Sequence, residues 1–271
     1  MINRFFFLLL FFPFIVFAQQ KQLGSILSEY RYKLSYQMDS TNTSSIREEM
    51  FLLQKGKAYS LFMSENSYIR DSMMSIQPER IDAGSLQHLL GQMPKTAFTY
   101  RILKSVDNDK VYYYDKIVTK PFKYEESPSY NWNIIGEKQM INGINCIVAE
   151  GSYAGRDYIA YFTTDIPLTD GPYKFGGLPG LIVKIQDRKG HYIFELLSYK
   201  NLPSDTRFLS LDRNFENGKL VSKADFYKML KNSNENIVNE LASVGFSVSP
   251  EHQKAIQDKR KKRNNPIELR P

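Results

Sequence analysis

Short runs in which apolar and polar residues alternate are the feature that most restricts the fold of this chain. Tyr30, Tyr32, Leu34 and Tyr36 alternate with polar or charged neighbours, and a period of two predicts a strand with one buried face. Tight-turn residues such as Asn142-Gly143 separate several runs of this kind. The other strand-like runs are residues 50–53, 58–63, 98–104, 111–117, 130–135, 137–141, 144–150, 158–163, 181–186 and 192–197. The sequence therefore predicts a predominantly antiparallel sheet.

A smaller part of the chain has helical character. Residues 78–92 begin with Pro78, and residues 223–231 and 235–242 carry apolar pairs four residues apart. Ser249-Pro250 starts a further helix that has almost no apolar face. Residues 119–129 contain Pro121 and Pro128 and are expected to form a loop. We therefore expect an α+β fold, predominantly antiparallel β, with a curved sheet or half-barrel and with inserted and C-terminal helices.

The first 18 residues have the pattern of a secretory signal peptide. Arg4 is followed by an apolar run, and the cleavage site is expected between Ala18 and Gln19. The run is shorter than the ~20 residues that span a bilayer. We expect a periplasmic or secreted protein whose mature part has no transmembrane segment. The expected divisions are a signal peptide (1–18), a single β-rich domain (19–249) and a basic C-terminal helix and tail (250–271).

The basic charge of the chain is concentrated near its C-terminal end. The formal net charge is +7, and residues 251–271 hold seven Lys or Arg against three acidic residues. Subtracting this +4 and the charge of Arg4 leaves +2 for the rest of the chain. A nearly neutral domain argues against a nucleic-acid-binding face.

A segment rich in glycine and proline lies between two of the expected strands. It reads Gly176-Gly177-Leu178-Pro179-Gly180, and Leu178-Pro179-Gly180 is typical of a type II turn. It lacks the Lys-Ser/Thr of a phosphate-binding loop, and it precedes a strand instead of a helix. We expect a structural corner that seats Leu178 and Leu181 against the sheet. The alternative is a loop that contacts a ligand or a partner.

The stretch formed by Phe175, Gly176, Gly177, Leu178, Pro179, Gly180, Leu181 and Ile182 resembles the signature of the GLPGLI family of exported bacterial proteins. The similarity extends to Trp132 and to residues 143–146, 158–167, 171–172 and 264–269. The resemblance implies export and the β-rich fold, and it implies no biochemical activity, because none is established for that family.

The arrangement of Met and His residues in the sequence does not indicate a metal or cofactor site. Six Met residues (38, 50, 63, 73, 74 and 93) lie near His88, and thioethers suit Cu(I). They have no repeated spacing, however, and Met commonly fills gaps in a core. His88, His191 and His252 are scattered along the chain. We expect no metal site and no cofactor.

Two sets of residues are candidates for catalytic chemistry. Cys146, the only cysteine, lies between Ile144 and Val148 on one strand face, which is typical of an inert buried thiol even if His191 were near. Asp165, Asp170 and Asp187 lie around the glycine-rich segment, where acidic residues commonly form turns. We expect no catalytic residues, and we keep a hydrolase built on either set as a third hypothesis.

Aromatic residues lead to the functional hypothesis. Tyr112, Tyr114, Trp132 and Tyr158 are candidates for the lining of a groove in a curved sheet, which is the usual composition of a ligand cavity. The alternative is an ordinary aromatic core. We expect a non-catalytic binder of an apolar or peptide ligand in the cell envelope. The alternative is a structural or interaction protein that docks an outer-membrane transport partner.

Overall fold

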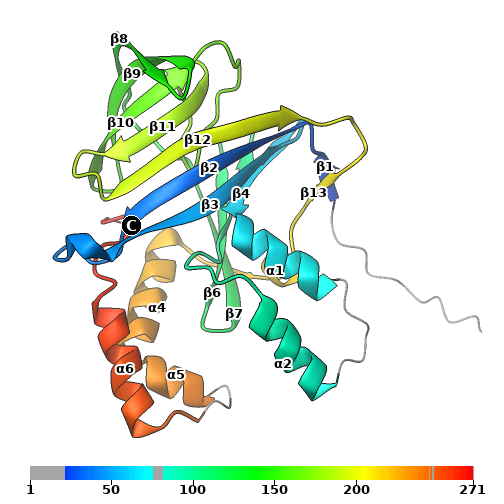
Figure 1. Ribbon diagram of the computed structural model, residues 1–271, viewed down its shortest axis with the longest axis vertical. Helices are drawn as coiled ribbons and strands as arrows, with labels where there is room; N and C mark the ends of the chain where they lie inside the picture. The colour runs from blue at the N-terminus through cyan, green and yellow to red at the C-terminus, as the bar shows by residue number, and fades with distance from the viewer. Residues whose placement is uncertain (1–21, 76–81, 244, 246, 271) are drawn as a thin grey trace, which may run out of the picture.

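The computed structural model describes residues 22–75, 82–243, 245 and 247–270 (Figure 1). The expected signal peptide and its cleavage site at Ala18 and Gln19 lie outside these residues, as do residues 78–81 of the first expected helix.

Two meanders of antiparallel strands make up the main sheet. The first contains β2 (Ser28–Gln37), β3 (Ile46–Lys55), β4 (Tyr59–Ser64), β5 (Arg101–Ser105), β6 (Val111–Ile117) and β7 (Lys120–Glu126). The second contains β8 (Asn133–Ile141), β9 (Ile144–Tyr153), β10 (Arg156–Thr163), β11 (Leu181–Asp187) and β12 (Tyr192–Asn201). The pairing of β2 with β12, from Tyr36 opposite Tyr192 to Ser28 opposite Asn201, joins the two meanders.

The sheet is open, and the short strand β14 (Lys219–Leu220) completes it. The strand order is β14-β7-β6-β5-β4-β3-β2-β12-β11-β10-β9-β8, and only the pairing of β14 with β7 is parallel. A separate two-stranded sheet pairs β1 (Gln22–Ser25) with β13 (Phe208–Ser210). The predicted class, an α+β fold dominated by antiparallel strands, is therefore confirmed.

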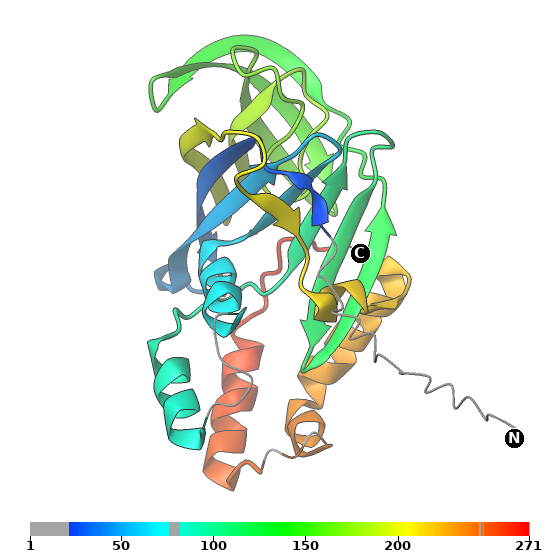
Figure 2. The same cartoon turned by 90° about the vertical axis from the view of Figure 1, so that its right-hand side faces the viewer.

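The helices lie between β4 and β5 and after β13. They are α1 (Glu65–Ser75), α2 (Ala83–Gln92), α3 (Arg213–Glu216), α4 (Lys223–Glu235), α5 (Ile237–Ser243) and α6 (Pro250–Lys261), with a 3-10 turn, η1, at Thr43–Ser45. Figures 1 and 2 show α2, α5 and α6 at the same end of the molecule. Inserted and C-terminal helices were both predicted, whereas α1 was not.

The expectation of a loop at residues 119–129 was wrong in part, because strand β7 occupies Lys120–Glu126. Pro121 lies in this strand opposite Lys116 of β6. Proline lacks the N–H that a central strand donates, but it is tolerated near a sheet edge. The outer neighbour of β7 is the two-residue β14, so the strand has one almost free edge that accommodates Pro121.

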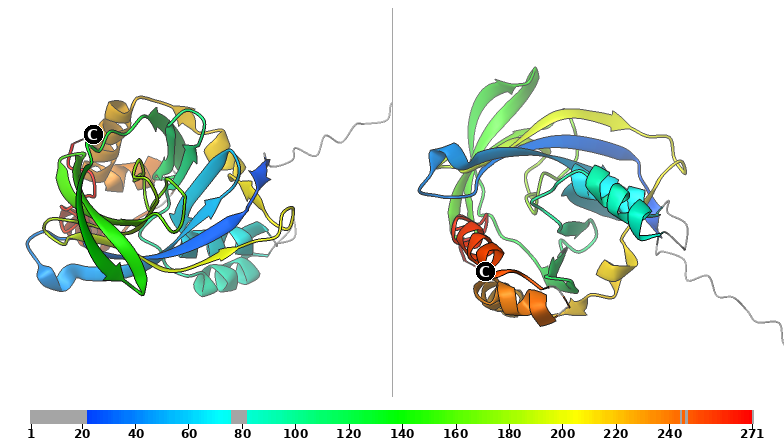
Figure 3. Two further views of the ribbon diagram at one scale, coloured as in Figure 1. Left: turned by 90° about the horizontal axis from the view of Figure 1, so that it is seen from above. Right: turned by 60° about the horizontal axis from the view of Figure 1, so that its bottom comes forward.

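One face of the sheet, here called the inner face, covers a core that both meanders share. Phe51 of β3 stacks on Phe62 of β4 with ring centroids 5.0 Å apart. Tyr173, from the loop between β10 and β11, lies 5.7 Å from Tyr100 and 6.4 Å from Phe194 of β12. Figure 3 shows the strands arranged around this interior, into which that loop enters. The aromatic residues of both meanders therefore form a single core.

The opposite face, here called the outer face, carries a second and smaller apolar cluster. Leu61 and Met63 of β4, Leu103 of β5 and Tyr114 of β6 pack there against Phe215 of α3. Side chains alternate between the two faces of a strand, which is why neighbouring residues of β4, β5 and β6 enter different clusters.

Candidate functional site

The glycine-rich loop between β10 and β11 is built into the core, because side chains of β5 and of the connection between β7 and β8 bind its backbone. The Tyr130 hydroxyl donates a hydrogen bond to the carbonyl of Lys174, and the Trp132 indole N–H donates to that of Gly176 at 2.8 Å. The Lys104 ammonium donates to the carbonyl of Gly171 at 2.6 Å. A buried carbonyl without a partner is costly, so these contacts allow an irregular segment to lie inside the protein.

The signature residues divide between the interior and the surface. Phe175, Leu178, Gly180, Leu181 and Ile182 are buried, and Gly176 is half-buried. Gly177 and Pro179 are exposed. The Gly180 N–H donates to the carbonyl of Leu178 at 2.8 Å, which closes a three-residue turn that is tighter than the expected type II turn. Only a small part of the signature can therefore meet a ligand from solvent.

Gly180 is required by the geometry of this turn. Its φ is +152°, and a Cβ at this position would lie 2.0 Å from the carbonyl oxygen of Thr163. No side chain can occupy this space unless the backbone of β10 moves.

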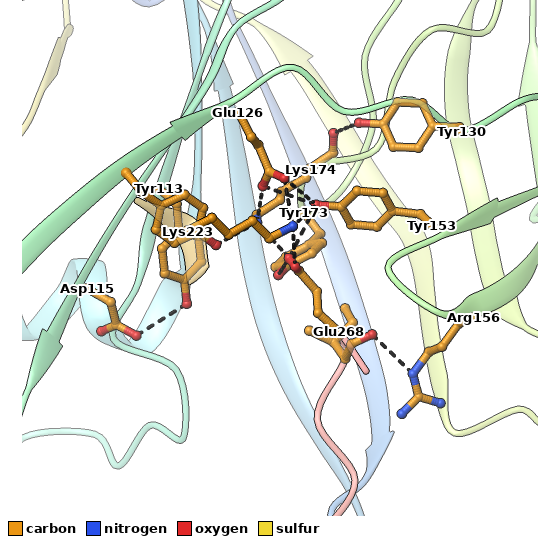
Figure 4. Close-up of polar contacts among 12 residues, drawn as sticks. Tyr113, Asp115, Glu126, Tyr130, Tyr153, Arg156, Tyr173, Lys174, Lys223 and Glu268 are labelled. Atoms are coloured by element: carbon orange, nitrogen blue, oxygen red, sulfur yellow. Dashed lines mark hydrogen bonds and ion pairs between the residues drawn. The ribbon is translucent and has the colours of Figure 1, made fainter. Parts of the chain in front are cut away.

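Four charged side chains, one of them from the glycine-rich loop, form a closed ring of ion pairs (Figure 4). This ring is here called the ion cluster. Glu126 is the last residue of β7, Lys174 belongs to the loop, Lys223 is the first residue of α4, and Glu268 follows α6. Each Lys contacts both carboxylates. Lys174 pairs with Glu126 and, at 2.6 Å, with Glu268, and Lys223 lies 2.8 Å from each of them. The side chains of Lys174 and Glu268 are 0% exposed.

Tyrosines surround the ion cluster. The Lys174 ammonium lies 4.9, 4.8 and 5.5 Å from the ring centroids of Tyr113, Tyr124 and Tyr173, which is the geometry of a cation–π contact. The Tyr173 hydroxyl donates to Glu268 Oε1 at 2.5 Å, and the Tyr153 hydroxyl donates to Glu126 at 3.1 Å. Burial raises the pKa of Tyr173 well above its usual value, so its hydroxyl stays protonated and remains a donor.

The ring favours the charged forms of Glu268 and Lys223. Burial raises the pKa of the Glu268 carboxyl, but Lys174 and Lys223 outweigh this effect, and the pKa lies below its ordinary value. Burial lowers the pKa of Lys223, but Glu268 and Glu126 outweigh it, and the pKa is raised. A balanced ring that is closed on both sides holds the structure together and leaves no charge directed at a substrate.

The ion cluster is not visible in the sequence as a pattern, because its members are far apart in the chain. One local signal was present: Lys174 stands between Tyr173 and Phe175 within a run of buried residues. A lysine is almost never fully buried unless it is paired. Such a position predicts a buried partner, although it does not say which carboxylate supplies it.

The candidate catalytic residues do not meet. Cys146 is buried in β9, and burial raises the pKa of its thiol to about 11. His191 directly precedes β12, three strand positions away, so the two residues are at least roughly 14 Å apart at the usual strand spacing. Asp170 pairs with Lys104, Asp187 pairs with Arg156 at 2.9 Å, and Asp165 is exposed. Within the described ranges, no group of three or more His, Cys, Asp or Glu is placed to hold a metal ion.

The four candidate groove aromatics lie on different faces. Tyr158 belongs to the inner core, 4.7 Å from the Phe175 ring, and Trp132 packs against that core. Tyr112 and Tyr114 belong to the cluster on the outer face. The structure therefore does not bring the four together into one groove.

An open cleft, here called the outer cleft, lies on the outer face. Its volume is about 960 Å3. It lies over β4, β5 and β6, between α1 with the end of α2 on one side and β13 with α3 on the other. Buried apolar side chains, namely those of Ile26, Met63, Met93 and Phe215, form its base.

Basic side chains outnumber acidic ones in the lining of the outer cleft. Arg70, Arg101, Lys116 and Arg207 line it, together with only two acidic residues, Asp71 and Asp212. Arg101 pairs with Asp71, and Arg207 lies 3.0 Å from Glu29, which is outside the lining. The Lys116 ammonium lies 5.1 Å from the Phe215 ring centroid. This lining favours an anionic group above an apolar base, and it disfavours a metal cation.

We expect Gly180→Ala to lower the free energy of unfolding by about 3 kcal/mol or more, because both the positive φ and the contact with Thr163 oppose a side chain. Gly190→Ala is the matched control, because Gly190 has a φ of +67° and open space around its position. It should cost about 1 kcal/mol. Urea unfolding of the purified variants measures both values, and equal losses would contradict this role of Gly180.

We expect Glu268→Gln to lower the free energy of unfolding by about 3–5 kcal/mol, because it leaves the buried Lys174 and the half-buried Lys223 facing one carboxylate. Glu137→Gln, at an exposed position of β8, should change stability by less than about 0.5 kcal/mol.

The same variant tests the pH dependence of the ion cluster. The lowered pKa of Glu268 contributes stability that is present above the ordinary glutamate pKa of 4.5 and is lost as the pH falls through the folded-state value. Unfolding measured from pH 7 to pH 3 should therefore show a smaller loss in Glu268→Gln than in the natural chain. Identical slopes would show that Glu268 is not ionised in the folded state.

Comparisons with known proteins support the fold and leave the activity open. Residues 150–184, which include the whole signature from Phe175 to Ile182, match the family described as "Protein of unknown function (Porph_ging)". No curated protein matches the chain. In the described part of the chain, no helix combines the length and apolar character that crossing a membrane requires.

Two solved structures of PNGF-II, in the P21 and C2 space groups, are similar to the chain with TM-scores of 0.52 and 0.50. Each is 15% identical in sequence, and each match covers 77% of this chain. The matches cover 34% and 33% of those structures, so the chain spans about a third of their length. At this level of identity the similarity shows a shared β-rich fold.

Proposed function

We propose that this chain is a non-catalytic binding protein of the cell envelope and that the outer cleft holds an apolar ligand with an anionic group. The observation that carries the proposal is the cleft itself. Its volume of about 960 Å3 lies at the upper end of the range of ligand cavities, and its base is apolar. The inner face, by contrast, is occupied by aromatic side chains and the ion cluster.

The charges of the cleft define the ligand further. Arg101 is held by Asp71 and by the backbone carbonyls of Thr99 and Tyr100. Lys116, by contrast, contacts the ring of Phe215, and a ring leaves the ammonium able to bind an anion as well. A carboxylate, sulfonate or phosphate at Lys116 with an apolar body over Met63 and Phe215 satisfies both parts of the lining. The proposed place in the envelope rests on the signal-peptide pattern of residues 1–18.

A second candidate function is docking to an outer-membrane transport partner. Strand β8 ends the sheet, and its exposed residues include Ile134, Ile135 and Met140. An exposed apolar edge strand is the kind of surface to which a partner adds a strand. Retention of the protein by outer-membrane extract, lost on Ile135→Lys, would favour this function.

We expect Lys116→Glu to weaken binding of an anilinonaphthalene sulfonate dye about 10-fold, equivalent to ~1.4 kcal/mol, because it reverses a charge beside the anion. Lys228→Glu makes the same charge change on the exposed face of α4 and should have no effect. Fluorescence titration at low and high salt measures both, and added salt should weaken binding. Equal affinities for the two variants would overturn the assignment of the cleft.

Native mass spectrometry of the protein purified from a periplasm then identifies the natural ligand. A discrete bound lipid or other anionic amphiphile, lost in Lys116→Glu, supports the proposal. A protein that still has its unliganded mass after envelope extract is added would contradict ligand binding and favour docking at the edge of β8.

A further inference from the structure

The chain returns to the inner core after α6. Residues 264–270, here called the C-terminal segment, follow the basic run at 259–263 and form neither helix nor strand. Figure 1 shows this segment leaving α6 and ending beside the sheet. Asn265 and Glu268 of the segment are buried, while Pro266 and Leu269 between and beyond them are exposed.

Side chains of the sheet recognise the backbone of the segment. Arg156 donates from Nη2 to the carbonyl of Pro266 at 2.6 Å and from Nε to that of Ile267 at 3.1 Å. The Tyr192 hydroxyl donates to the carbonyl of Asn265 at 2.6 Å. The N–H of Leu269 donates to the carbonyl of Ala154 at 2.8 Å. Backbone recognition of this kind holds an extended peptide independently of most of its side chains.

Two buried side chains of the segment supply sequence-specific contacts, and the exposed Asn264 adds hydrogen bonds with Ser40 and Asp39 at 2.9 Å. The Asn265 amide accepts from Arg156 at 2.6 Å through Oδ1 and donates to the carbonyl of Gln37 at 2.8 Å. Three residues later, Glu268 enters the ion cluster, as Figure 4 shows. These two contacts are polar, so specific hydrogen bonds and ion pairs hold the segment more than apolar packing does.

We propose that the recess around Arg156, Lys174 and Lys223 is a peptide-binding site that the chain's own C-terminal segment occupies. It takes an extended peptide with an Asn and, three residues later, an acidic residue. With the segment absent, these three cations face only Asp187 and Glu126. The remaining positive charge attracts an acidic side chain, and the buried donors of Arg156 and Tyr192 require carbonyl acceptors.

The connection to the rest of the chain allows such an exchange. Helix α6 has no buried residues, and Lys259, Lys261, Lys262 and Arg263 are exposed. A second copy of the chain and a separate protein with the same pattern are both sources of a peptide with this chemistry. The site itself does not depend on the outer cleft, which lies on the opposite face.

The test uses the full chain with a specific protease site in place of residues 259–263. After folding, the site is cut, and a fluorescently labelled peptide of residues 264–271 is added. We expect the labelled peptide to exchange into the cut protein, as measured by anisotropy. Peptides with Glu268→Gln or Asn265→Ala should bind at least 10-fold more weakly, whereas Leu269→Ala should stay within about two-fold.

Two results would overturn the proposal. The first is a cut protein that stays folded but admits no labelled peptide. The second is loss of the fold, followed by circular dichroism, as the segment leaves. The uncut Glu268→Gln chain provides an independent check that needs no cleavage: it should admit the labelled natural peptide, while the uncut natural chain excludes it. Equal exclusion by both chains would also count against the site.

Size-exclusion chromatography with light scattering distinguishes the sources of the peptide. Dimers of the uncut chain that dissociate when the peptide is added would identify a second copy as the donor. A monomer at all concentrations, combined with peptide exchange, would identify a separate protein.

Discussion

The ring of four alternating charges is the interaction on which the rest of the inner core depends. Taking a charged group out of water costs several kcal/mol unless opposite charges and hydrogen bonds compensate it. Here each charge touches two of opposite sign, and tyrosine rings and hydroxyls complete the shell. The ring joins the end of β7, the glycine-rich loop, the start of α4 and the C-terminal segment. Loss of any one member leaves an unbalanced charge among the other three, so the ring stabilises these four segments together.

The two faces of the sheet have separate roles, and the alternation of side chains along each strand assigns them. Tyr113 of β6 faces inward and covers Lys174, while Tyr112 and Tyr114 on either side face outward. Ile102 of β5 is likewise buried in the inner core, and Arg101 lines the outer cleft. A shift of register by one residue would exchange these roles, so the pairing of β5 with β6 protects the core and the cleft together.

The sequence predicted those features that depend on neighbouring residues. The alternation from Tyr30 to Tyr36 corresponds to β2, and Asn142-Gly143 forms the turn between β8 and β9. Helix α1 was missed because Ile69 and Met74 are exposed, so the helix lacks the apolar stripe that makes a helix visible in a sequence. The ion cluster could not be predicted, because 142 residues separate Glu126 from Glu268 and only the folded chain brings them together. The outer cleft likewise combines residues from elements far apart in the chain.

The order of the ring members along the chain has a consequence for how the protein reaches its native state. Glu126, Lys174 and Lys223 all precede Glu268 in the sequence, so a chain that has folded only as far as α4 contains a surplus cation at the ion cluster. The energetic penalty of that cation opposes early collapse of the inner core. The inner core is therefore completed only after Glu268 joins the ion cluster, and the chain remains partly unfolded until then. Non-local contacts of this kind also slow folding, since a long loop must close before the contact forms.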